Sequence, residues 1–214
     1  MRRYVLGLML LLALVASAKA QESARTDKVK IDDDQTYLVL STKRIQTMEK
    51  ELDEVAAKGF RVMFGGPTQA FDMALLLKRT PETVAAPYTY KILATSRIKT
   101  MQKELNELAG QGFRLLSRTI IFKQGLFTAE LLMIMEREPQ STKTYEYKLL
   151  TGSKETKLHK KVDEAIKQGF VPVTMITIGE HIIVVEKEGK VGDKPSTTSE
   201  SDAGAGHTPA TPGG

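Results

Sequence analysis

Three stretches of the chain carry apolar residues at helical spacing, and each lies between apolar runs that are typical of strands. Ile45, Met48, Leu52, Val55 and Ala56 fall on one face of the first stretch, whereas Glu, Lys and Gln fill the opposite face. The matching residues of the other two stretches are Ile98, Met101, Leu105, Leu108 and Ala109, then Leu158, Val162, Ala165 and Ile166. The pattern therefore predicts three amphipathic helices.

The segments around these helices repeat one another. The segment Tyr37–Met48 returns as Tyr90–Met101 and, more weakly, as Tyr147–Lys154. Each tyrosine precedes a Gly-Phe pair by 22 residues, and over 25 positions the first two copies match at 15 and the last two at 9. The starts are 53 and 57 residues apart, so differences in length lie after the Gly-Phe pair. We interpret this as three copies of one unit.

Each copy begins with a predicted strand and ends with two more. The expected pairs are 61–64 with 71–78 around a Gly65-Gly66-Pro67 turn, 114–122 with 128–135, and 173–178 with 181–186. A solitary unit of about 50 residues is small for a stable core, so we expect the three to pack into one body. The predicted fold is α+β, with antiparallel hairpins covered by amphipathic helices. The expected repeats are 37–81, 88–139 and 145–188.

The glycine of each Gly-Phe pair stands where a helix should stop. Gly59, Gly112 and Gly169 suit the left-handed conformation that ends many helices, and the following Phe makes an apolar contact. We therefore predict that these glycines end helices and do not form phosphate-binding loops.

This unit resembles the family called domain of unknown function 4177. The residues that carry the resemblance are a tyrosine-containing first strand (Tyr88-Thr89-Tyr90-Lys91 and Tyr145-Glu146-Tyr147-Lys148), a short amphipathic helix and a glycine-aromatic pair before a hairpin. It covers roughly residues 35–188, three times over. The resemblance implies a small α+β fold and no activity.

The two ends of the chain differ from the repeats. Residues 1–20 combine a basic start, an apolar run and small residues at Ala18 and Ala20, as in a secretory signal peptide. Its apolar run is short for a membrane-spanning helix, so we expect cleavage, no transmembrane segment afterwards, and a periplasmic or secreted protein. Residues 21–36 form a polar leader with Asp32-Asp33-Asp34, and 189–214 have the composition of a disordered tail.

Charge adds little to the functional assignment. The formal net charge is +5, but loss of Arg2, Arg3 and Lys19 leaves 28 basic residues against 26 acidic ones. A basic net charge that belongs largely to the targeting segment does not support a nucleic-acid partner.

The residue content also limits the candidate chemistry. With no cysteine there is no thiol nucleophile and no thiolate metal site. His159, His181 and His207 lack metal-ligand spacing, and no serine stands in a nucleophile elbow. We therefore predict no catalytic residues, no metal and no cofactor.

One weak candidate site remains at the start of each helix. A cation and a hydroxyl precede each helix, where free N–H groups could help to hold a carboxylate or phosphate. The residues are Thr42 and Arg44, Thr95 and Arg97, and Ser153 and Lys154. The alternative is that these cations pair with a nearby Glu or cover a tyrosine.

Together these features favour a non-enzymatic interaction module of the cell envelope with an unknown envelope or secreted protein partner. A second reading is a periplasmic protein that binds a small anionic ligand between repeats. A third is a hydrolase whose site is not recognisable from the sequence.

Overall fold

The computed structural model describes residues 29–68, 73–80, 86–124, 129–178 and 180–190. Within these ranges the chain forms three helices, ten strands and a short 3-10 helix. The signal-peptide prediction and almost all of the tail prediction lie outside the described residues.

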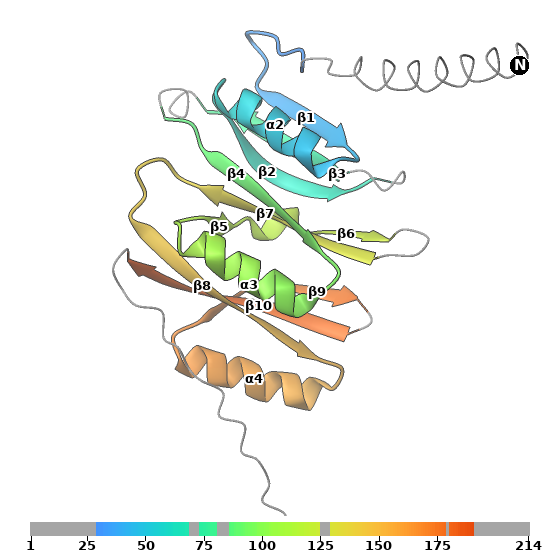
Figure 1. Cartoon of the computed structure of the whole chain (residues 1–214), viewed down its shortest axis with the longest axis vertical. Coiled ribbons are helices and arrows are strands. Elements are labelled where there is room, and N and C mark those ends of the chain that lie inside the picture. The colour runs from blue at the N-terminus through green and yellow to red at the C-terminus, as the bar shows by residue number, and fades with distance from the viewer. Residues whose placement is uncertain (1–28, 69–72, 81–85, 125–128, 179, 191–214) are drawn as a thin grey trace, which may run out of the picture.

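The elements form three units that follow one another along the long axis, with β1 and α2 at one end and α4 at the other (Figure 1). The first unit (residues 37–79) comprises β1 (Tyr37–Thr42), α2 (Ile45–Ala56), β2 (Phe60–Pro67) and β3 (Met73–Arg79). The second (89–137) comprises β4 (Thr89–Thr95), α3 (Ile98–Ala109), β5 (Arg114–Leu115), η2 (Ser117–Thr119), β6 (Ile121–Gln124) and β7 (Ala129–Arg137). The third (143–190) comprises β8 (Lys143–Gly152), α4 (Glu155–Lys167), β9 (Val171–Ile178) and β10 (Glu180–Lys190).

Every unit contains one antiparallel sheet whose last strand lies in the middle. The strand orders are β1-β3-β2, β4-β7-β5 with β6 also on β7, and β8-β10-β9. The tyrosine of each first strand pairs with an equivalent position: Tyr37 with Lys78, Tyr90 with Glu136 and Tyr147 with Glu186. The predicted mixture of helices and antiparallel strands is confirmed.

The helices α2 and α3 bury the faces that the sequence indicates. Met48 and Leu52 of α2, and Met101 and Leu105 of α3, are inaccessible to solvent. In α4, Leu158 and Ala165 are buried as expected, but Ile166, which was predicted on the same face, is 50% exposed. Each helix ends before a glycine with a positive φ, which is 84° at Gly59. The values at Gly112 and Gly169 are 89° and 86°, so the predicted left-handed helix ends are confirmed.

The central strand β7 contributes to two cores. Its residues from Leu131 to Glu136 are all buried. Leu132 and Ile134 belong to the apolar cluster of the first unit, whereas Met133 and Met135 belong to the cluster that extends into the third. Successive side chains of a strand point to opposite faces, so the first unit covers one face of β7, and α3 of its own unit covers the other together with the third unit.

Two strand boundaries differ from the sequence prediction. Gly65-Gly66-Pro67 was expected to be a turn, but these residues extend β2 and pair with Leu75, Ala74 and Met73. The predicted strand 114–122 is interrupted by η2 and divides into β5 and β6. The ends of β2, β5 and β6 therefore follow from their pairing with β3 and β7. The turn propensity of the local sequence does not determine them.

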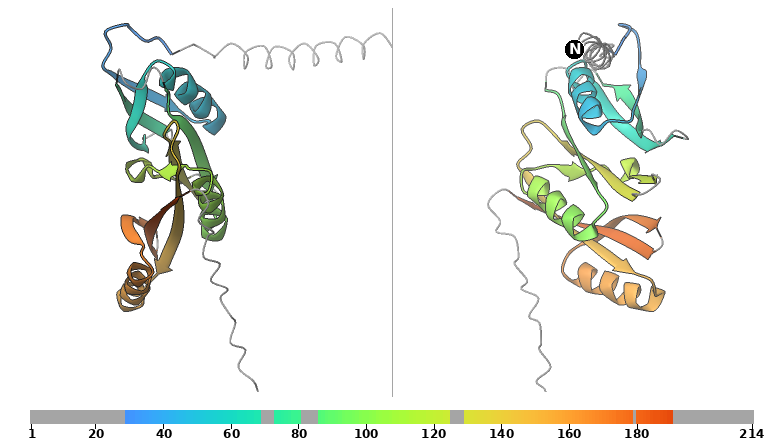
Figure 2. Two further views of the ribbon diagram at one scale, coloured as in Figure 1. Left: turned by 90° about the vertical axis from the view of Figure 1, so that its left-hand side faces the viewer. Right: turned by 45° about the vertical axis from the view of Figure 1, so that its right-hand side comes forward.

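The first strand of the second and third units is capped by the helix of the preceding unit. The Ile92 N–H of β4 donates to Oε1 of Glu49 on α2 at 3.0 Å, and the Leu149 N–H of β8 donates to Oε1 of Gln102 on α3 at 3.0 Å. Asn106 of α3 also exchanges two hydrogen bonds with the backbone of Tyr147. In the side view α2 and α3 lie along one side of the stack and α4 at its far end (Figure 2). The helices thus satisfy strand edges that would otherwise be open.

The segments next to the units are more ordered than their composition indicates. Val29 and Ile31 of the polar leader pack against the first core, and the Arg79 side chain donates to the Asp32 and Asp33 carbonyl oxygens. At the other end β10 continues to Lys190, two residues into the predicted tail. Among the described residues, no helix is both long and apolar enough to cross a membrane.

Candidate functional site

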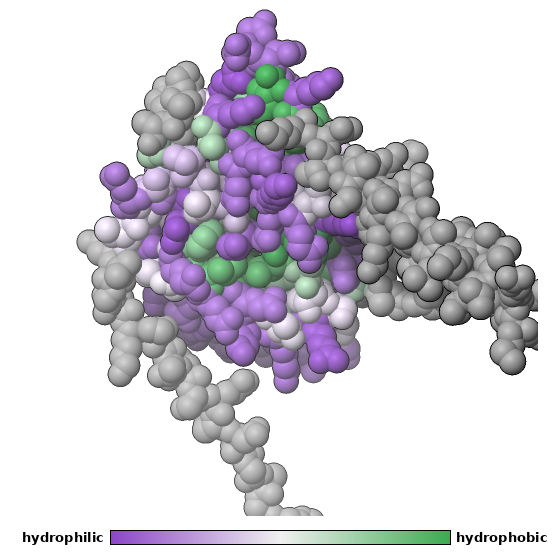
Figure 3. All heavy atoms as spheres, turned by 45° about the horizontal axis from the view of Figure 1, so that its top comes forward, coloured by the Kyte–Doolittle hydropathy of each residue, from purple (hydrophilic) through white to green (hydrophobic). Residues whose placement is uncertain are grey.

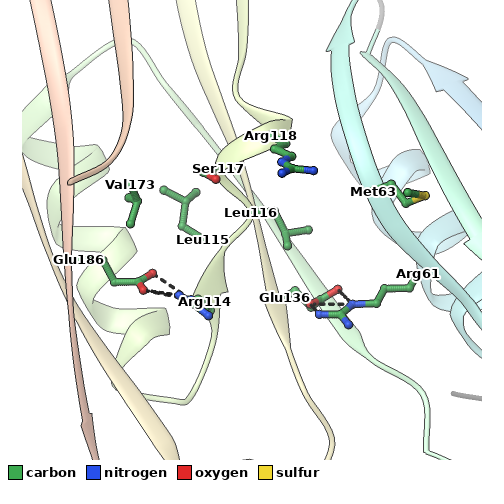
Figure 4. A pocket seen from close by; sticks show the side chains of 10 residues that line it. All are labelled: Arg61, Met63, Arg114, Leu115, Leu116, Ser117, Arg118, Glu136, Val173 and Glu186. Atoms are coloured by element: carbon green, nitrogen blue, oxygen red, sulfur yellow. Dashed lines mark hydrogen bonds and ion pairs between the residues drawn. The ribbon is translucent and has the colours of Figure 1, made fainter. Parts of the chain in front are cut away.

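A hollow of about 460 Å³ lies where the three units meet (Figure 4). The first unit contributes residues of β2, the second contributes β5, η2 and β7, and the third contributes β9 and β10. The lining residues are Arg61, Met63, Arg114, Leu115, Leu116, Ser117, Arg118, Glu136, Val173 and Glu186.

An apolar row within the hollow comes from one position in each unit. Met63, Leu116 and Val173 each stand four residues after the glycine that ends the unit's helix. Met63 and Val173 lie where β2 and β9 lose register with their partner strands, and Leu116 immediately precedes η2. Since a bulge turns a side chain away from its strand partners, the bulges account for the direction of Met63 and Val173, whereas Leu116 reaches the hollow where β5 gives way to η2.

The first and second units are joined beside this row by an ionic cluster in which Glu136 is buried and the Arg61 side chain is 46% exposed. The Arg61 side chain donates to both oxygens of Glu136, with 2.7 Å between Nη2 and Oε1. The Tyr90 hydroxyl donates to Glu136 at 3.0 Å and accepts the N–H of Val62 at 3.2 Å. The guanidinium of Arg61 also lies 4.2 Å from the ring centre of Tyr88. Glu136 is only 6% exposed, so its charge depends on these partners.

The second and third units are joined in the same way. Arg114 donates to both oxygens of Glu186, with 2.8 Å between Nη2 and Oε1. The Tyr147 hydroxyl donates to Glu186 at 2.7 Å and accepts the N–H of Leu115 at 2.8 Å. The Tyr145 ring lies beneath the Arg114 guanidinium. We call these two arrangements the Arg–Glu–Tyr clasps.

The tyrosines of the clasps are held in their neutral form. Burial, followed by the adjacent Glu136 or Glu186 carboxylate, raises the pKa of Tyr90 and of Tyr147 well above the ordinary value. Hydrogen bonding to the carboxylates raises the pKa of Arg61 and Arg114. The clasps are therefore suited to joining units and not to exchanging protons near neutral pH.

Stability should consequently fall steeply at alkaline pH. The unfolded chain loses its tyrosine protons above the ordinary pKa of 10.0, whereas folded Tyr90 and Tyr147 keep theirs, so unfolding is favoured as the pH rises. Each tyrosine contributes a slope of about 1.4 kcal/mol per pH unit above that point. Urea unfolding between pH 8 and pH 11.5 should show this slope reduced in a Tyr90→Phe, Tyr147→Phe variant. Tyr37→Phe, which alters an exposed tyrosine, serves as the control; equal slopes in all three proteins would contradict the expectation.

The residues predicted at the helix starts lie outside the hollow. Thr42 and Thr95 are the last residues of β1 and β4, whereas Arg44, Arg97, Ser153 and Lys154 lie in the strand–helix loop of their own unit. The Thr42 and Thr95 hydroxyls accept the backbone N–H of Arg44 and Arg97 at 3.3 and 3.2 Å. No side chain of these arginines or of Lys154 caps its own helix. The structure does not bring the three pairs together, and anion binding there stays a prediction.

Sequence reasoning missed the clasps. Arg61 and Arg114 follow the Gly-Phe pairs directly, and Glu136 and Glu186 stand opposite Tyr90 and Tyr147. The available signal was this staggered pattern of an arginine in one unit and a glutamate in the next. In the part of the chain that the structure describes, no three His, Asp or Glu side chains are placed to hold a metal ion.

Comparison of the chain with protein-family models, curated proteins and solved structures finds no match. The resemblance to domain of unknown function 4177 therefore stays a prediction.

Proposed function

We propose that this chain is an exported, non-enzymatic interaction module of the cell envelope, periplasmic or secreted, built from three tandem repeats. The repeat interpretation is supported by the common strand–helix–strand–strand order, the positive φ at equivalent glycines and the two matching clasps. Repeat arrays characteristically bind partners over surfaces to which several units contribute.

The observation that carries this proposal is the composition of the hollow. Its apolar row takes one residue from each unit, and arginine–glutamate pairs from two junctions stand beside it. Such a surface exists only when all three units are stacked. An apolar centre with charged surroundings is the arrangement that protein interfaces use.

The hydrogen bonds already made by the two glutamates of the hollow support a binding function and not a catalytic one. Both carboxylates of the hollow are engaged by an arginine and a tyrosine, and both tyrosines are already donating. A general base needs an accessible lone pair near its operating pH, which this arrangement does not favour.

The test is co-purification from the native envelope fraction after cross-linking. The wild type and Gln46→Glu, which adds a carboxylate to an exposed position of α2, should capture the same partner. Met63→Glu places a carboxylate in the apolar row and should lose that partner while keeping its melting temperature. Capture that is equally strong in the Met63→Glu variant would show that the hollow is not the binding surface.

A second candidate function is the binding of a small anionic ligand in the same hollow. Arg118 is exposed and its guanidinium lies 5.4 Å from the ring centre of Phe64. Within the described ranges it has no carboxylate partner, unlike Arg61 and Arg114. An unneutralised guanidinium beside apolar residues suits a carboxylate with an apolar body.

Titration calorimetry with octanoate at low salt distinguishes this candidate from the predicted helix-start sites. If the hollow binds anions, Arg118→Ala should abolish the heat of binding while Arg44→Ala, Arg97→Ala retains it. The opposite result would assign the anion to the helix starts, and no heat with the wild type would remove both candidates.

A further inference from the structure

The large apolar side chains that are exposed in the described residues gather at the two ends of the stack. Tyr37 and Val39 of β1 are 52% and 65% exposed, and a view tilted by 45° toward this end shows apolar side chains within a mainly polar surface (Figure 3). At the opposite end, Ile166 of α4 and Val171 and Met175 of β9 are 50%, 57% and 63% exposed. The remaining one, Phe64, lies beside Arg118.

The two exposed residues of β1 occupy positions that are buried between units elsewhere. Tyr37 aligns with Tyr90 and Tyr147, which are 2% and 1% exposed. Val39 aligns with Ile92 and Leu149, whose N–H groups donate to the preceding helix. In the described ranges no helix precedes β1. This strand therefore has the residues that contact a preceding helix in the other two units, but no such helix covers it there.

The three exposed residues at the other end are also in junction positions. Ile166 aligns with Ala56 and Ala109, which are buried, and Val171 aligns with the clasp arginines. Met175 aligns with exposed Arg118 of the second unit and with Gly65 of the first, where an added Cβ would lie 2.7 Å from Leu75 of its own unit and 3.2 Å from the Thr119 Cα of the next. This end therefore presents the complementary half of the junction.

The helix α4 keeps the polar groups that cap a following strand. His159 stands at the position of Glu49 and Gln102, and Asp163 at the position of Asn106. A neutral imidazole nitrogen and a carboxylate can both accept a backbone N–H, which is what β1 would offer. Both side chains are exposed.

At the two ends of the stack, the positions that form a clasp elsewhere hold other residues. Lys78 stands where Glu136 and Glu186 stand, and Val171 replaces the arginine. Pro172 replaces the residue whose N–H donates to the tyrosine hydroxyl. Since Arg and Glu are absent together, closing these ends would leave no clasp guanidinium or carboxylate unpaired, and the charged group that it would bring into the contact is the exposed Lys78.

From these observations we propose that the chain self-associates head to tail, with α4 and β9 of one copy docking on β1 of the next. The contact continues the arrangement by which α2 covers β4 and α3 covers β8. Because it joins two different surfaces, it generates open chains or closed rings and not a two-fold dimer.

Sedimentation velocity over a concentration series tests the proposal with variants that block one end each. Val39→Lys blocks the β1 end and Ile166→Lys blocks the α4 end; both side chains are exposed, and unchanged melting temperatures would verify the fold. The wild type should form a series of oligomers, whereas each variant alone should sediment as a monomer. An equimolar mixture of the two variants should form dimers and nothing larger, because one intact end of each kind remains.

Three results would overturn it. The wild type could remain monomeric at every concentration, which would leave both ends without a second copy. A single variant could still dimerise, which would indicate contact between like ends. The mixture could also stay monomeric while the wild type assembles, which would place the contact elsewhere on the surface.

Discussion

A fragment containing residues 88–139 alone is expected to show no cooperative unfolding transition. It holds the whole second unit, but Leu132 and Ile134 of β7 pack with the first unit and Tyr147 and Leu149 of the third cover the other core. Removing both neighbours exposes apolar side chains on both faces of the central strand. A chain of this length does not have enough remaining core to compensate for the loss of conformational entropy.

Circular dichroism melting and amide proton dispersion measure this directly. The matched control is a fragment of residues 88–190, which restores the cover of the second core and should unfold with a recognisable transition. A monomeric 88–139 fragment with dispersed resonances and a cooperative melt would contradict the shared core.

Arg114→Ala is expected to lower the free energy of unfolding by about 3 kcal/mol, because it leaves the buried Glu186 carboxylate without its cation. Tyr147 alone would then donate a side-chain hydrogen bond to that carboxylate. Chemical denaturation at pH 7 provides the measurement.

Arg118→Ala is the matched control, since it removes an exposed arginine that lines the same hollow. It should change the free energy of unfolding by less than about 0.5 kcal/mol. Arg114→Leu, Glu186→Leu, which removes both charges, should be more stable than Arg114→Ala. A loss in Arg118→Ala equal to that in Arg114→Ala would mean that the clasp contributes nothing specific.

The secondary structure was predictable because its causes are local. The spacing of Met48, Leu52 and Val55 decides which face of α2 is buried, and Gly59 decides where the helical segment ends. The continuous apolar run of β7 correctly indicated a strand covered on both faces. The extension of β2 through Gly65-Gly66-Pro67 was missed because its cause is pairing with β3.

The clasps could not be predicted from any one unit by itself. Arg61 and Glu136 are 75 residues apart, and each belongs to a different unit. Only the relative placement of two units brings them together, and the sequence pattern does not specify that placement. The hollow depends in addition on bulges at Met63 and Val173, for which the apolar pattern has no distinct signal.

The stagger of the clasps has a consequence for how such a chain can change in length. The first unit supplies Arg61 but has Lys78, and the third supplies Glu186 but has Val171. The second unit carries both halves, with Tyr90 and Glu136 on one side and Arg114 on the other. Duplicating this middle segment in the gene would therefore lengthen the protein, and each new junction would already have the arginine, glutamate and tyrosine of a clasp. Duplicating either terminal segment would create a junction that lacks part of the clasp.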